Sequence, residues 1–144
     1  MYLDKFDFKD KEMTFGSALH VFEQNGFIHA EQWDYERVTF DYKMLDKTDN
    51  ATYYLRVQAV AVDGDIPKDS TRIRFLTPIL GRHYYPHGVE YDEDFKEKIV
   101  NKCNEKLEKV YSTWNEYAVE ALEKGAINER INNFNSDLNK ATNF

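Results

Sequence analysis

Cysteine, proline and glycine are all scarce in this chain of 144 residues, which has one, three and six of them. The single cysteine, Cys103, excludes a disulfide within the chain and is typical of a protein from a reducing compartment. Cys103 also occupies an apolar position in a helical pattern. We therefore predict a buried, unreactive thiol at this position.

Long hydrophobic runs are absent. No segment approaches the roughly 20 apolar residues that a membrane-spanning helix needs. The first residues, Met1 to Asp7, lack the basic and then apolar pattern of a secretion signal. The sequence accordingly predicts a cytoplasmic protein with no membrane partner.

Positive charge is in deficit, because 19 Lys and Arg face 26 Asp and Glu and give a formal net charge of −7. Basic residues do not outnumber acidic ones on either side of Asp94. Such a chain lacks the basic patch that holds a phosphate backbone, so we predict no nucleic-acid partner. A phosphate loop, a dinucleotide fingerprint, a zinc knuckle and a nucleophile elbow are also missing, and no cofactor is predicted.

Aromatic residues, by contrast, make up 15% of the chain, with ten Tyr and ten Phe. Five segments have the two-residue period and the aromatic or β-branched content of strands, with polar turn clusters between the last four. They are residues 3–8, 27–34, 37–44, 52–62 and 70–77. In the fourth, Leu55, Val57, Ala59 and Ala61 share one face, so the predicted sheet has one dry and one wet side.

Two helical patterns flank these strands. In the first, Thr14 is an N-cap and Gly26 a left-handed stop, which predicts a helix over residues 14–25. In the second, which we expect to open at Asp92 or Asp94, apolar residues alternate three and four apart. They are Val100, Cys103, Leu107, Val110, Trp114, Tyr117 and Ala121. Gly125 is expected to interrupt this helix, and a weaker helical pattern follows.

These patterns predict an α+β fold. It consists of an antiparallel sheet of about five strands, one N-terminal helix packed on it, and a long C-terminal helix or helical hairpin. Residues 1–92 are the expected core domain, and residues 93–144 are an extension packed on the core or on a second chain. A regular heptad stripe on so long a helix makes self-association, as a homodimer, the favoured assembly.

The segment from Gly81 to Tyr91 is the densest in side chains that combine a flat apolar body with a polar tip. Such side chains suit a pocket or a protein contact. Together with the polar sheet face, this segment gives the candidate binding residues: Trp33, Arg37, Tyr54, Arg56, Arg82, His83, Tyr84, Tyr85, His87, Glu90 and Tyr91. A small anionic ligand or a protein is the expected partner, and a structural loop is the alternative.

Two chemical alternatives remain open at this stage. His83, His87 and Glu90 are spaced as weak candidate metal ligands, which would allow a small metal-assisted or histidine-dependent hydrolase or isomerase. Asp34 and Glu36 share a strand face and are candidates for an acid/base pair, although pairing with arginines on the wet face explains them better. Whether the protein is an enzyme is uncertain, and a non-enzymatic binding or assembly protein is favoured.

Three segments resemble the YugN-like family of small bacterial proteins. They are Gln32 to Asp41, Tyr53 to Val57 and Leu80 to Tyr91, within a similarity that runs from about Gly26 to Asp92. The resemblance implies a small cytoplasmic α+β protein. It supplies no activity, substrate or catalytic residue to carry over to this chain.

Overall fold

The computed structural model describes residues 1–29 and 34–117. The chain divides into two compact units, Met1–Tyr111 and Ser112–Phe144. The elements of the first unit are β1 (Glu12–Thr14), α1 (Phe15–Gln24), β2 (Ile28–His29), β3 (Arg37–Asp46), β4 (Ala51–Asp63), β5 (Arg72–Phe75), β6 (Ile79–Tyr84) and β7 (Gly88–Glu90). A C-terminal helix begins at residue 97 and is described to residue 117. The predicted α+β class is confirmed.

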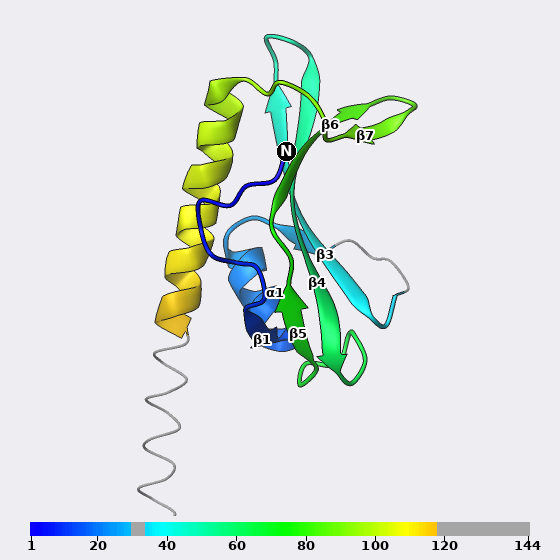
Figure 1. The fold of residues 1–144 in the computed structure, drawn as a ribbon, viewed down its shortest axis with the longest axis vertical. Helices are drawn as coiled ribbons and strands as arrows, with labels where there is room; N and C mark the ends of the chain where they lie inside the picture. Colours follow the sequence, from blue (N-terminus) through cyan, green and yellow to red (C-terminus); the bar gives the residue numbers. More distant parts are fainter. Residues whose placement is uncertain (30–33, 118–144) are drawn as a thin grey trace, which may run out of the picture. The chain divides into compact units, whose positions relative to one another are not determined.

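The seven strands form one antiparallel sheet in which β4, of 13 residues, is the central element. One edge of β4 pairs with β3 along ten residues of each strand. Its other edge pairs first with β6 and then with β5, so two short strands share one side of a long one (Figure 1). β1 extends the sheet beyond β5, β2 beyond β3, and β7 beyond β6.

The inner face of the sheet carries the core, as the alternation in β4 predicts. Leu55, Val57 and Ala59 are at most 1% exposed. α1 covers this face: the ring of Phe22 stacks on Phe40 of β3 at 4.5 Å between centroids and lies 5.1 Å from Phe27. Aromatic rings thus form part of the contact between α1 and the sheet.

α1 ends as the sequence predicts. Thr14 is its N-cap and accepts a hydrogen bond from the backbone N–H of Ser17 at 3.3 Å. At the other end, Gly26 has a φ of +83°, the left-handed conformation that glycine adopts without strain. The helix is therefore fixed at both ends by local sequence.

The C-terminal helix up to Tyr111 packs on the same side of the sheet as α1 (Figure 1). Ile99, Cys103, Leu107 and Val110 are buried, and the sulfur of Cys103 lies 3.9 Å from that of Met44 on β3. The predicted buried thiol is confirmed, and burial raises the pKa of Cys103 to about 12. This part of the heptad stripe is used inside the chain.

Three predictions of secondary structure are wrong. Residues 3–8 form no strand, because the rings of Phe6 and Phe8 each pack 5.8 Å from the ring of Tyr111 and draw the chain off the sheet. The helix begins at residue 97, after a connection in which the ring of Phe95 packs on Tyr53. The loop predicted from Arg82 to Tyr91 is not a loop, because most of its residues belong to the β6–β7 hairpin.

Other predictions lie outside the described residues. These are residues 30–33 of the strand predicted over 27–34, which include the candidate Trp33, the apolar position Ala121, and the break at Gly125 with the helical pattern after it. In the described part of the chain, no helix has both the length and the apolar character required to cross a membrane.

Candidate binding surface on the outer face of the sheet

Five side chains meet on the outer face, the side of the sheet opposite α1. They come from β3, β4, β6 and the residue after β7, and they are Asp41, Tyr54, Arg56, His83 and Tyr91. We call them the arginine–tyrosine cluster. Arg56 is its centre: Nε donates to Asp41 Oδ1 at 3.0 Å and Nη1 donates to Tyr91 Oη at 2.6 Å.

The aromatic members surround this centre. The guanidinium of Arg56 lies 5.4 Å from the centroid of the Tyr54 ring, within the range of a cation–π contact. The rings of Tyr54 and His83 meet edge to face at 6.1 Å. The side chains of Arg56 and Asp41 are 27% and 17% exposed. The cluster is thus ordered by its own contacts while it still reaches solvent.

Gly81 makes the cluster possible. It pairs with Tyr54 in the sheet, and a Cβ atom at Gly81 would lie 2.3 Å from Val89 Cγ1 and 2.7 Å from Tyr91 Cε1. Because glycine has no Cβ, the ring of Tyr91 crosses the backbone of β6 and reaches Arg56. Neither Gly81 nor Asp41 could be assigned this role from the sequence, because their neighbours depend on strand register.

The environment of the cluster raises the pKa of both Asp41 and Arg56, which favours the neutral form of Asp41 and the charged form of Arg56. Burial is the largest influence on Asp41 and raises its pKa, which the hydrogen bond and charge of Arg56 offset in part. Burial would lower the pKa of Arg56, but the contacts with Asp41 and Tyr91 outweigh burial and raise it. Folding thus disfavours the ionised form of Asp41, so the ion pair orients Arg56 more than it stabilises the fold.

Arg82 and Tyr84 lie apart from the cluster, because successive residues of β6 alternate between faces. The guanidinium of Arg82 sits 5.9 Å from the Tyr53 ring centroid and 4.8 Å from that of Tyr84. The Tyr84 hydroxyl bonds to Glu93, and this hydrogen bond, followed by burial, raises the pKa of Tyr84. Tyr84 thus fastens the hairpin to the connection before the C-terminal helix, while Arg82 packs over the rings of Tyr53 and Tyr84.

Tyr85 and His87 occupy the tip of the hairpin, where Tyr85 is 91% exposed and His87 is also exposed. Glu90 accepts backbone hydrogen bonds from the two residues that follow it, at 3.1 and 3.0 Å. In the hairpin register Glu90 is opposite Arg82 and His83 is opposite Val89, which places Glu90 and His83 on different faces. Within residues 1–29 and 34–117, no three His, Cys, Asp or Glu side chains are grouped so that they could hold a metal ion.

Arg37 lies further along the outer face, beside a hollow of about 200 Å³ whose lining includes Asp34, Thr39, Gln58 and Leu76. Before β3, Asp34 Oδ1 accepts the backbone N–H of Glu36 at 2.9 Å and closes a turn.

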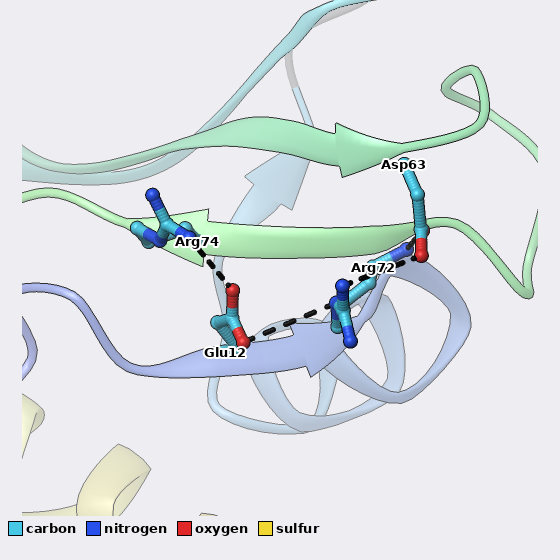
Figure 2. Close-up of polar contacts among 4 residues, drawn as sticks. All are labelled: Glu12, Asp63, Arg72 and Arg74. Carbon is cyan, nitrogen blue, oxygen red and sulfur yellow. Dashed lines mark hydrogen bonds and ion pairs between the residues drawn. The ribbon is translucent and has the colours of Figure 1, made fainter.

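The opposite edge of the outer face holds a second polar group, at β1, β5 and the end of β4. Glu12 accepts from Arg74 at 3.1 Å and lies 3.9 Å from Arg72, which in turn is 3.6 Å from Asp63 (Figure 2). Paired acids and arginines therefore occupy the wet face at Arg74, with Glu12, and at Arg56, with Asp41. Among the described residues, however, Asp34 and Glu36 form no ion pair with an arginine.

Comparisons with known proteins agree with this architecture. The chain is 48% identical over 84 residues to the uncharacterized protein YlbA of Bacillus subtilis (strain 168), covering 57% of this chain and 68% of YlbA. It is similar in structure to the uncharacterized conserved protein YugN from Geobacillus kaustophilus HTA426, with a TM-score of 0.71 and 36% identity over 82% of this chain and 98% of that one. The model of the YugN-like family matches residues 5–124, so the chain belongs to this family.

Proposed function

We propose that this protein is a non-enzymatic cytoplasmic binding protein that recognises its partner with the outer face of the sheet and the β6–β7 hairpin. The observation that carries this proposal is the arginine–tyrosine cluster, which is held in place by hydrogen bonds and ring contacts yet stays partly exposed. Arginine and tyrosine are the residue types that contribute most at protein contacts. Side chains that are already ordered lose little entropy on binding.

The use of the polar groups favours binding over catalysis. Arg56 is engaged with Asp41 and Tyr91, so its donors position neighbours within the cluster. The thiol of Cys103 is fully buried and carries a raised pKa, which suppresses the reactive thiolate. A tyrosine at the hairpin tip that is 91% exposed suits a surface contact.

The proposal includes self-association. Buried residues of the heptad stripe run from Cys103 through Leu107 and Val110 to Trp114, and in the sequence the stripe continues to Ala121. An apolar heptad position gains stability when a second helix packs on it. A second copy of the chain supplies such a helix with matching spacing.

Light scattering on the full chain over a range of concentrations tests self-association. We expect a molar mass of twice 17.1 kDa that falls toward 17.1 kDa on dilution. A constant mass of 17.1 kDa at every concentration would show that this part of the proposal is wrong.

Substitution at the hairpin tip tests the binding surface. Tyr85→Ser removes an exposed ring and is expected to weaken the assembly. Tyr35→Ser is the matched control, because Tyr35 is 55% exposed but precedes β3. Equal masses for the two variants at all concentrations would exclude the hairpin tip from the contact.

A further inference from the structure

The hollow beside Arg37 lies on the outer face between the two groups of paired charges. Thr39 and Gln58 are cross-strand partners, and so are Arg37 and Val60, so these four residues form a patch on β3 and β4. The backbone N–H of Leu76 donates to the carbonyl of Gln58 at 2.8 Å and places Leu76 at the border of the same hollow. The lining thus offers an amide and a hydroxyl beside two apolar side chains.

Arg37 differs from the other arginines in the described part of the chain. Arg56, Arg72 and Arg74 each have a carboxylate within 4 Å, and Arg82 lies over two tyrosine rings. Among the described residues, Arg37 has neither kind of partner, although it is exposed and borders the hollow. A guanidinium presents donors in a fork that matches a carboxylate in two parallel hydrogen bonds.

Asp34 supplies the opposite charge in the same hollow. Its Oδ1 is engaged by the backbone N–H of Glu36, and Oδ2 makes no hydrogen bond to any residue that the structure describes. The hollow therefore presents one positive and one negative group that do not form an ion pair with each other. This pattern is complementary to a small molecule that carries both charges.

A second hollow, of about 500 Å³, adjoins the first, because Gln58 and Leu76 line both. Its lining also includes Tyr2 and Ile79. The exposed side chains of Tyr2 and Leu76, at 71% and 40%, give this neighbouring space an apolar wall. An apolar group that extends from the first hollow past Leu76 can therefore contact apolar side chains in the second hollow.

We infer that the paired hollows bind a free amino acid with an apolar side chain. Its carboxylate is held by Arg37, its ammonium by Asp34, and its side chain lies over Leu76 toward Tyr2 and Ile79. The first hollow, of about 200 Å³, is below the roughly 300–1,000 Å³ of sites for drug-sized ligands, so it suits the compact carboxylate and ammonium groups, while the second hollow, of about 500 Å³, leaves room for the side chain. The inference rests on the proposed binding role of the outer face and names the ligand class for it.

Thermal unfolding and titration calorimetry of the full chain test the inference with L-leucine, L-phenylalanine and two analogues. Phenylalaninamide lacks the carboxylate and 3-phenylpropanoate lacks the ammonium. We expect both amino acids to raise Tm and to give saturable heats, and each analogue to bind about tenfold more weakly or worse. No response to either amino acid would overturn the inference, as would equal binding of 3-phenylpropanoate, which would indicate a simple anion site.

Single-residue variants test whether the Tm response to amino acids arises at this hollow. Arg37→Gln removes the carboxylate contact, and Asp34→Asn removes the negative charge while its amide oxygen can still accept the Glu36 N–H. Both are expected to lose the Tm response while folded. Arg72→Gln makes the same change as Arg37→Gln at the edge of the sheet and keeps the response; an unchanged response in Arg37→Gln would contradict the assigned site.

The result is separable from that of the proposed function. Self-association and the role of the hairpin tip are read from molar mass without added ligand. If the protein forms dimers but does not bind amino acids, this inference is wrong and the proposed self-association is unaffected.

Discussion

Replacement of Gly81 by alanine tests whether the hairpin and the arginine–tyrosine cluster are one packed unit. The added Cβ would lie 2.3 Å from Val89 Cγ1 and 2.7 Å from Tyr91 Cε1, whereas carbon atoms normally sit about 3.5–4.0 Å apart. Val89 can change rotamer, but the Tyr91 ring is held by the 2.6 Å hydrogen bond to Arg56. Overpacking of this kind costs about 1–3 kcal/mol, and we expect Gly81→Ala to lose that much stability.

Urea unfolding of four proteins measures this loss: the wild type, Gly81→Ala, the double variant Val89→Ala/Tyr91→Ala, and the triple variant. In the double-variant background the new Cβ has room, so the alanine should be neutral or should stabilise by about 0.5–1 kcal/mol, as it does in an ordinary strand. For a chain of this length, Tm should fall by roughly 2–4 °C per kcal/mol in the single variant. A single variant as stable as the wild type, or an equal cost in both backgrounds, would refute the packing argument.

Three further predictions concern the core, the thiol and one buried acid, Asp46. Phe22→Ala should lower the free energy of unfolding by about 3–5 kcal/mol in denaturant titrations, because the ring stacks on Phe40 and contacts Phe27, whereas Phe22→Leu should lose less. A rise in the pKa of Cys103 from 9.0 to about 12 reduces the thiolate about a thousandfold near pH 8, so Ellman's reagent should label the native protein slowly and the unfolded protein fast. Burial alone would raise the pKa of Asp46, but hydrogen bonds from Lys98, Lys96 and the Thr48 N–H outweigh it and lower the pKa. The stability that Asp46 contributes is therefore present above its unfolded pKa of roughly 4 and is lost as pH falls through the lower folded value, so Asp46→Asn should show a shallower loss of stability in acid.

The parts of the fold that the sequence predicted depend on contacts close in the chain or on long, regular patterns. Thr14 and Gly26 set the ends of α1 through their own side chain and backbone, and eleven residues of alternation locate β4 and its buried face. A helical stripe of four turns places Cys103 and Val110 inside. These signals need no knowledge of distant partners.

The short elements could not be predicted in the same way. In β6, Arg82 and Tyr84 lie on one face and His83 on the other, and β7 has only three residues, so the two-residue period is hidden although Pro86 and Gly88 mark a turn. Residues 3–8 have an alternating pattern, yet their two phenylalanines find the ring of Tyr111, 100 residues or more away in the chain. Such choices depend on tertiary contacts that outweigh local propensity.

The candidate surface shows why residue type alone could not define the site. Arg56 faces Asp41 across the β3–β4 ladder, and Arg74 is opposite Glu12 on β1, so each is neutralised by its register partner. Arg37 is opposite Val60, which carries no charge. Because a shift of one residue in register moves every side chain to the other face, the pairing of strands decides which arginine remains available. The sequence presents these arginines as equivalent members of one wet face, and the register separates two that organise the surface from one that is left for a ligand.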